Sequence, residues 1–136
     1  MLLSLARLAR ALLCALAITA CGNTTPPPGT ARQQQTVAGL TITLERTAEP
    51  KLNQTQAFTI RLTDVQNMPV DGADVYLDLA MPADPMGTNR PIATAQGAGV
   101  YTAQSAFIMA GDWAITVVAT VDGTEHRAVF DALVTT

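Results

Sequence analysis

Residues 113–134 read WAITVVATVDGTEHRAVFDALV, and this stretch decides the fold. Apolar residues alternate with small or polar ones over residues 113–121, and the alternation returns over residues 127–134. A period of two is the pattern of a β-strand that buries one face. Asp122-Gly123 lies between the two runs, and Asp-Gly suits the type I′ turn of a tight hairpin. The stretch therefore predicts two antiparallel strands joined by a short turn.

Similar alternation occurs in four earlier runs, and turn residues separate them. These runs predict strands over residues 40–45, 58–63, 75–80 and 101–107, and a further short strand is predicted near residues 91–94. No helical periodicity is visible after residue 36. About seven short strands in about 100 residues predict an all-β fold, an immunoglobulin-like sandwich of two sheets.

The first 20 residues have the organisation of an export signal. Arg7 and Arg10 precede an uncharged apolar run, residues 11–18, which is too short for the about 20 residues of a membrane-spanning helix. The run ends in Ile18-Thr19-Ala20-Cys21, which resembles the lipobox of bacterial lipoproteins. This resemblance implies cleavage before Cys21 and acylation of its thiol, with palmitate-type chains that anchor the protein to a membrane.

Two other interpretations of this segment remain open. It could be a buried helix with an incidental cysteine, or an ordinary signal peptide whose removal leaves the protein without an anchor. The lipoprotein hypothesis predicts a protein of the cell envelope that faces the periplasm or the exterior. Gly22 follows the cysteine, where an acidic residue would favour retention in the inner membrane of some bacteria, so an outer location is favoured.

The predicted division of the mature chain follows its composition. Residues 22–36 read GNTTPPPGTARQQQT and are nearly free of apolar side chains, so we expect residues 21–36 to be the lipidated cysteine and a disordered tether. Residues 37–136 are expected to form the β-sandwich domain.

Charge and cysteine content exclude several classes of protein. After Cys21 the chain has 6 basic and 11 acidic residues, a net charge of −5, which lacks the basic surface needed for nucleic acid. It also gives no attraction to an anionic membrane surface, so the lipid would provide the anchor. Cys14 lies within the predicted signal, which leaves the mature domain without a disulfide.

The residues that could support catalysis are few. His126 is the single histidine and is expected on the surface of the last strand, and Ser105 is the only serine after Cys21. A nucleophile, a base and an orienting group must be in contact for covalent catalysis, and the sequence does not predict such a set. Four aspartates, which are expected to be solvated surface charges, follow one another closely: Asp71, Asp74, Asp78 and Asp84. A calcium site is the alternative, although their spacing matches no established loop. The sequence predicts that the protein is not an enzyme.

Three methionines suggest a binding site for a specific metal ion. Met81 and Met86 lie close together in a loop, and Met109 precedes the predicted 113–121 strand. Thioether sulfur is a soft ligand that suits Cu(I). Methionine also fills irregular gaps in hydrophobic cores, so copper binding and core packing are competing hypotheses for these residues.

A longer motif surrounds the third methionine. Gly99 and Tyr101 are followed by Phe107, Met109, Gly111 and Trp113, and Met81-Pro82 begins the preceding loop. This pattern resembles the YtkA-like domain family and the related FixH-like proteins, over about residues 37–134. The resemblance implies an immunoglobulin-like sandwich and a non-catalytic envelope protein, sometimes near copper handling or respiratory oxidase assembly. Family members often carry histidines in the loop after Met-Pro, and this chain has none there.

Two functional hypotheses follow. In the first, the protein is a membrane-anchored lipoprotein whose domain is a non-catalytic binding or structural module for a partner protein of the envelope. In the second, it binds or delivers copper through Met81, Met86 and Met109.

Overall fold

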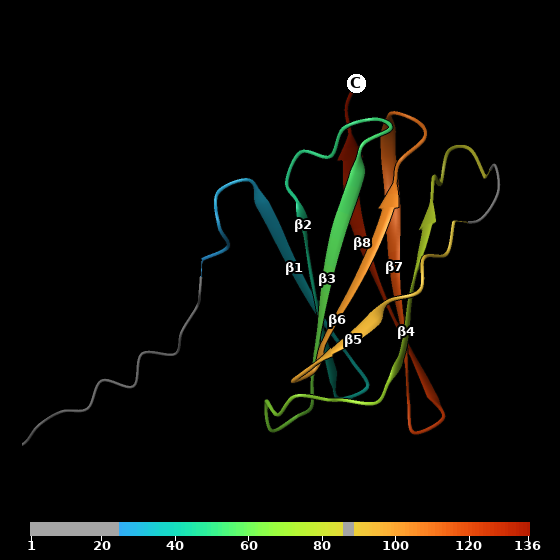
Figure 1. The fold of residues 1–136 in the computed structure, drawn as a ribbon. Coiled ribbons are helices and arrows are strands. Elements are labelled where there is room, and N and C mark those ends of the chain that lie inside the picture. Colours follow the sequence, from blue (N-terminus) through green and yellow to red (C-terminus); the bar gives the residue numbers. More distant parts are fainter. Residues whose placement is uncertain (1–24, 86–88) are drawn as a thin grey trace, which may run out of the picture.

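The structure is a computed structural model that describes residues 25–85 and 89–136. Cys21, Met86 and the predicted signal peptide lie outside these residues. The described chain forms eight strands (Figure 1): β1 Thr30–Val37, β2 Leu40–Thr47, β3 Thr55–Thr63, β4 Asp74–Ala80, β5 Thr94–Gly97, β6 Val100–Ala106, β7 Gly111–Val121 and β8 Thr124–Val134.

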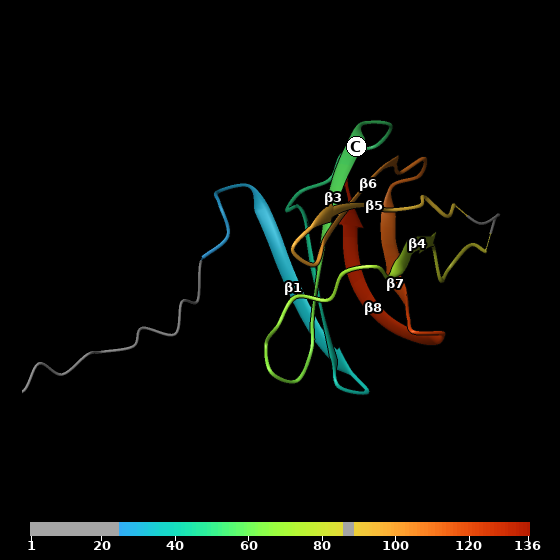
Figure 2. The same ribbon diagram turned by 60° about the horizontal axis from the view of Figure 1, so that its bottom comes forward.

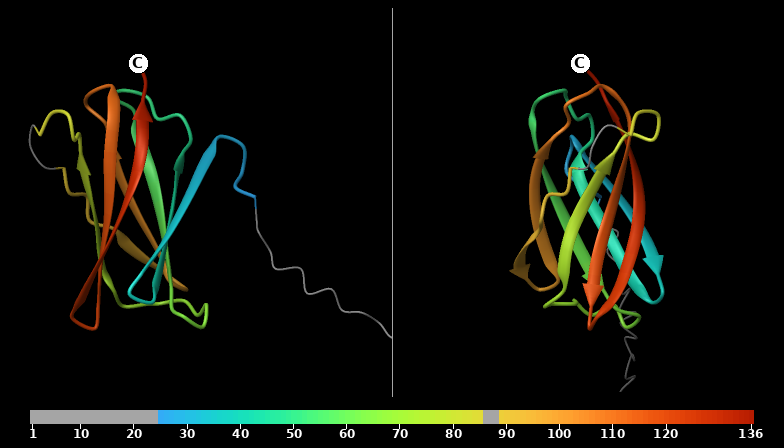
Figure 3. Two further views of the ribbon diagram at one scale, coloured as in Figure 1. Left: turned by 180° about the vertical axis from the view of Figure 1, so that it is seen from behind. Right: turned by 90° about the vertical axis from the view of Figure 1, so that its right-hand side faces the viewer.

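The strands form two antiparallel sheets that pack face to face. One sheet has the order β1-β2-β3-β6-β5, and the other has the order β4-β7-β8. Views from behind and from the side show the three-stranded sheet as a separate layer (Figure 3). The predicted all-β sandwich is confirmed, with eight strands where about seven were expected. Within the described part of the chain, no helix has the length and apolar character needed to cross a bilayer.

The core lies between the sheets, where the inner residues of each alternating run meet. Trp113, Phe107 and Phe58 form its aromatic part, with the Phe107 ring centroid 5.1 Å from that of Trp113 and 6.1 Å from that of Phe58. The predicted hairpin is confirmed, since β7 pairs with β8 as far as Val121↔Thr124 around Asp122-Gly123. Both turn residues have positive φ, as a type I′ turn requires.

The two sheets meet along one side through the segment before β5. Leu77 N donates to Pro91 O at 3.0 Å, and Leu79 N donates to Asn89 O at 2.9 Å, so residues 89–93 pair with the edge of β4. The chain then crosses to the other sheet, where β5 pairs with β6. The strand predicted near residues 91–94 is therefore displaced, because the regular strand begins at Thr94.

The predicted disordered tether is wrong from Thr30 onward. Residues 30–37 form β1, which pairs with β2 from Thr30↔Thr47 to Val37↔Leu40. A tight turn with positive φ at Ala38 and Gly39 closes this hairpin. The segment lacks an apolar face, but strand pairing uses main-chain groups and does not require one.

Polar side chains hold β1 and β2 against the edge of β8. Gln35 Nε2 donates to Val129 O at 2.6 Å, and Arg46 Nη2 donates to Asp131 O at 2.8 Å. Burial lowers the pKa of the Arg46 guanidinium, whose Nη1 also binds the carbonyls of Thr47 and Ala48. Carbonyl oxygens on this edge of β8 thus receive hydrogen bonds from side chains of the other sheet. Figure 2 shows β1 and β8 approaching each other at this side.

The strand ends define two ends of the sandwich. The start of β1 and the ends of β4, β6 and β8 all lie at the first end (Figure 1). At the opposite end lie the β1–β2 and β7–β8 hairpin turns and the β5–β6 turn. The chain that precedes β1 therefore enters the domain at the first end, which we call the entry end.

Candidate functional site

A polar groove lies on the outer face of β1, β2 and β3. It is a shallow hollow of about 520 Å³, open to solvent, and all of its lining side chains are polar or charged: Arg32, Gln34, Thr41, Thr43, Arg61, Thr63 and Asn67. These side chains come from the outward positions of neighbouring strands, because antiparallel register sets Gln34 opposite Thr43 and Thr43 opposite Arg61. We call this surface the polar groove.

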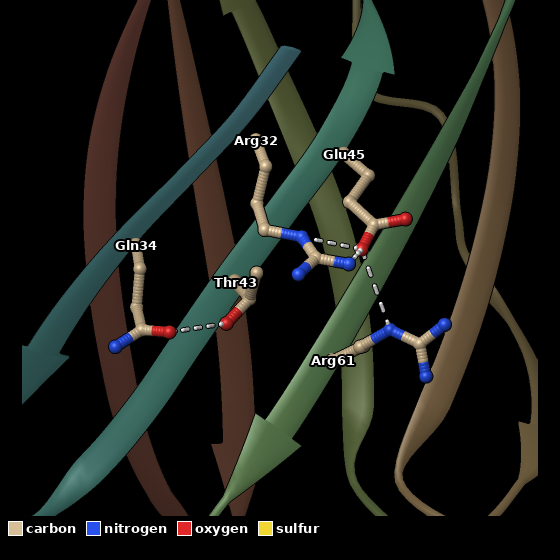
Figure 4. Close-up of polar contacts among 5 residues, drawn as sticks. All are labelled: Arg32, Gln34, Thr43, Glu45 and Arg61. Carbon is tan, nitrogen blue, oxygen red and sulfur yellow. Dashed lines mark hydrogen bonds and ion pairs between the residues drawn. The ribbon is translucent and has the colours of Figure 1, made fainter. Parts of the chain in front are cut away.

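Glu45 lies beside the groove and holds two arginines (Figure 4). Its Oε1 accepts from Arg32 through both Nε, at 2.8 Å, and Nη2. Arg61 Nε lies 3.6 Å from the same oxygen. The Glu45 side chain is 15% exposed, whereas that of Arg61 is 49% exposed. Arg61 is therefore the more loosely held cation and the one that solvent reaches more easily.

Gln34 is oriented by Thr43. The Thr43 hydroxyl donates to Gln34 Oε1 at 3.1 Å. In Figure 4 the amide nitrogen of Gln34 points away from this bond. The two N–H donors of the amide therefore lie on the side of Gln34 that faces away from Thr43 and Arg61.

The structure brings two of the three predicted copper ligands to the same end. Met81 follows the last residue of β4, and Met109 lies two residues before β7, whose first residues pair near the end of β4. Both side chains are half-buried against the hydrophobic core. The Met81 Cε would lie 3.0 Å from a β-carbon at Gly111, and the Met109 carbonyl accepts from Trp113 Nε1 at 3.0 Å. Met86 lies outside the described residues.

His126 does not belong to this end, and its predicted surface position is wrong. It pairs with Ala119, eight residues along β7 from Gly111, which corresponds to roughly 26 Å of strand. Its exposed fraction is only 9%, and Nδ1 lies 3.1 Å from Val37 O. The ring is buried because β1, which the sequence did not predict, covers this part of β8. His126 therefore cannot complete a site with Met81 and Met109.

The other candidate residues have structural contacts. Asp71 Oδ1 accepts from Gly99 N at 2.7 Å, and Asp78 forms an ion pair with Arg90 at 3.1 Å. Asp74 and Asp84 are exposed, as predicted. Ser105 Oγ accepts from Asn89 Nδ2 at 2.7 Å, near the entry end and far from His126. Among residues 25–85 and 89–136, no group of three or more His, Cys, Asp or Glu side chains could hold a metal ion.

Sequence reasoning did not find the polar groove. Arg32 and Gln34 were assigned to the tether, so their position beside β2 was missed. The alternation of 40–45 and 58–63 places Thr43, Glu45 and Arg61 on an outward face, but their proximity depends on strand register. No signal in the sequence gives that register directly.

Comparison with known proteins agrees with the motif around Trp113. No curated protein matches the chain at a significant level. The sequence model of the YtkA-like family matches residues 34–118, from within β1 to the middle of β7, which is more than half of the chain. The match includes Met81-Pro82, the Gly99 and Tyr101 positions, and the turn from Phe107 to Trp113. The chain belongs to the YtkA-like family.

Proposed function

We propose that this YtkA-like protein is a lipid-anchored protein of the cell envelope, whose sandwich is a non-catalytic binding module. The anchor is supported by the order of Arg7 and Arg10, the apolar run of residues 11–18, and Cys21. The strand β1 begins at Thr30, so nine residue steps separate the proposed lipid from the domain. They can span at most roughly 30 Å, which keeps the entry end of the sandwich near the membrane.

One observation carries the non-catalytic part of the proposal. Three side chains that could act as an acid or a base, those of His126, Asp71 and Tyr101, are held by structural hydrogen bonds in different parts of the sandwich. His126 contacts the Val37 carbonyl, Asp71 fixes the Gly99 amide, and Tyr101 Oη donates to Val70 O while accepting from Ala73 N. Catalysis needs such groups to converge on one reacting atom, and these groups stabilise loops and strand edges instead.

The binding role is supported by the polar groove. Its donors lie on a five-stranded sheet, which is a rigid support for a recognition surface. The groove is formed mainly by the middle of β1, β2 and β3, with Asn67 added from the β3–β4 loop. An anchor at the entry end leaves this lateral face accessible to components of the envelope.

The anchor is tested with two cysteine variants. Cys21→Ser should lose the membrane association of the full chain, because serine has no thiol to accept the lipid. Cys14→Ser is the matched control, since Cys14 precedes the proposed cleavage site and should leave localisation unchanged. The measurement is the fraction of protein in the membrane pellet after cell lysis and a high-salt wash. Equal retention of both variants would refute the lipid anchor.

The shared end of Met81 and Met109 keeps copper binding as a second candidate function. A Cu(I) competition titration of the full chain should compare wild type with the Met81→Leu, Met109→Leu double variant. Leucine preserves volume and apolarity, so the variant should fold normally. The copper hypothesis predicts at least a tenfold loss of affinity, which corresponds to about 1.4 kcal/mol. Equal affinity would show that both methionines are packing residues.

A further inference from the structure

We propose that the polar groove binds an acidic saccharide, with the carboxylate of a uronate unit placed at Arg61 and sugar hydroxyls at Gln34 and the groove threonines. This inference rests on the proposed function, because the groove meets such polymers only if the domain faces the envelope. The charge of the groove and the arrangement of its donors support it.

The local charge of the groove favours one anionic group. Arg32 and Arg61 lie on the two sides of Glu45, so the cluster carries two positive charges and one negative charge. The whole chain has a formal net charge of −3 at pH 7, so this cluster is cationic within an acidic protein. Arg32 binds Glu45 through two nitrogens, which leaves Arg61 to supply the excess charge to a ligand.

The groove offers one guanidinium together with amide and hydroxyl groups, which are the donors that a carboxylate and sugar hydroxyls need. Within the described residues, Arg61 makes a single ion pair, through Nε to Glu45. In Figure 4 its terminal nitrogens point away from Glu45. A planar guanidinium can bind a carboxylate through two parallel hydrogen bonds. The Gln34 amide and the hydroxyls of Thr41 and Thr63 can then donate to or accept from sugar hydroxyls.

The surroundings of the groove argue against a peptide as ligand. Peptides are commonly recognised by adding a strand to a sheet edge or by filling apolar pockets. The strand β2, beneath the centre of the groove, is paired on both sides, with β1 and with β3. The side chains that line the groove include no apolar residue. The centre of the groove therefore offers a peptide neither a free strand edge nor an apolar pocket, and the free edge of its sheet on this side is that of β1.

The absence of aromatic rings from the groove restricts the saccharide class. All six aromatic residues lie in the described chain. Phe58, Tyr101, Phe107, Trp113 and Phe130 are buried in the core, and Tyr76 is on β4 in the other sheet. A neutral sugar would therefore lack a ring for stacking, and charge-assisted hydrogen bonds must supply the affinity. This requirement selects a saccharide that bears an anionic group, and a planar carboxylate is the anion that matches the guanidinium of Arg61 through two parallel hydrogen bonds.

The test is a binding titration of the full chain in detergent, with trigalacturonate as the probe. Wild type should bind trigalacturonate at least tenfold more tightly than the neutral trisaccharide maltotriose, and the preference should fall as ionic strength rises. Arg61→Gln should weaken trigalacturonate binding about tenfold, because it removes the charge and keeps a polar side chain. Arg90→Gln is the matched control, since Arg90 has a 55% exposed side chain paired with Asp78, away from the groove.

Three results would overturn the proposal. The first is equal affinity of the wild type for trigalacturonate and maltotriose. The second is an equal change in trigalacturonate affinity in the Arg61→Gln and Arg90→Gln variants. The third is equal affinity of the wild type for trigalacturonate and triglutamate. The last result would show that the groove recognises carboxylates without selecting a saccharide. None of these results depends on the lipid anchor, whose failure would appear only in the behaviour of the Cys21→Ser variant.

Discussion

Trp113→Ala should lower the free energy of unfolding by about 3–5 kcal/mol, the cost typical of a large aromatic truncation in a core. Trp113 is only 7% exposed, and its ring lies 5.1 Å from that of Phe107 in an edge-to-face arrangement. Its Nε1 also donates to Met109 O at 3.0 Å, which holds the turn before β7. The substitution therefore leaves a cavity and removes a hydrogen bond in the family's own motif.

The loss is measured by urea unfolding followed by circular dichroism, since the variant has no tryptophan fluorescence. Leu133→Ala is the matched control on the outer face of the same sheet, where the side chain is 60% exposed. This control should change the unfolding free energy by less than about 0.5 kcal/mol. A loss below about 1 kcal/mol for Trp113→Ala would show that the strand phase in β7 is wrong.

Gly99→Ala should have the second large effect on stability. Gly99 has a φ of +70°, and a β-carbon there would lie 2.6 Å from Leu62 O and 3.0 Å from Val70 N. Both atoms are backbone, so neither can move away without shifting β3 or the β3–β4 loop. Such a shift would also strain the bonds from Gly99 N to Asp71 and from Leu62 N to Gly99 O.

Gly97→Ala is the control for the strain of positive φ alone. Gly97 has a φ of +86°, and a β-carbon there would have no neighbouring atom within 4 Å. Gly97→Ala should lower the free energy of unfolding by roughly 1–2 kcal/mol, which is the cost of the left-handed conformation for a residue with a β-carbon. Gly99→Ala should lower the free energy of unfolding by about 1–3 kcal/mol more than Gly97→Ala does, which is the usual range for overpacking. The free energies are measured by chemical denaturation. If the two variants lose equal amounts of unfolding free energy, the close packing of Gly99 against β3 is contradicted.

Period-two alternation was sufficient to predict most of the sandwich. Each predicted strand with an apolar face is present, because burial of that face fixes both the strand and its phase. Trp113 and Ile115 on β7 and Phe130 on β8 point into the core as expected. The Asp122-Gly123 turn followed from local chemistry, which the surrounding fold does not alter.

The strand β1 could not be predicted in this way. Most of its side chains are polar, and the inward positions are occupied by Ala31, Gln33, Gln35 and Val37, of which only Val37 packs against the core. The strand is held by main-chain pairing with β2 and by side-chain bonds such as Gln35 to Val129 O. Because main-chain pairing leaves no pattern in the side chains and Val129 is distant in sequence, composition alone indicated a tether.

The errors at the candidate sites have the same physical origin. His126 was placed on the surface because β1, which covers it, was unknown. The polar groove was missed because Arg32, Glu45 and Arg61 become neighbours only through the register of β1, β2 and β3. The approach of Met81 to Gly111 also depends on how β4 pairs with β7.

The most direct test of the proposed function is the intact mass of the protein purified from native membranes. The account predicts a chain that begins at Cys21 and carries a diacylglyceryl group on its thiol. Digestion should place the added mass on the peptide that contains Cys21, and mild base, which hydrolyses ester-linked chains, should remove most of it. The account would be contradicted by a chain that retains residues 1–20. It would also be contradicted by a cleaved chain that carries no lipid, whether that chain begins at Cys21 or at another residue.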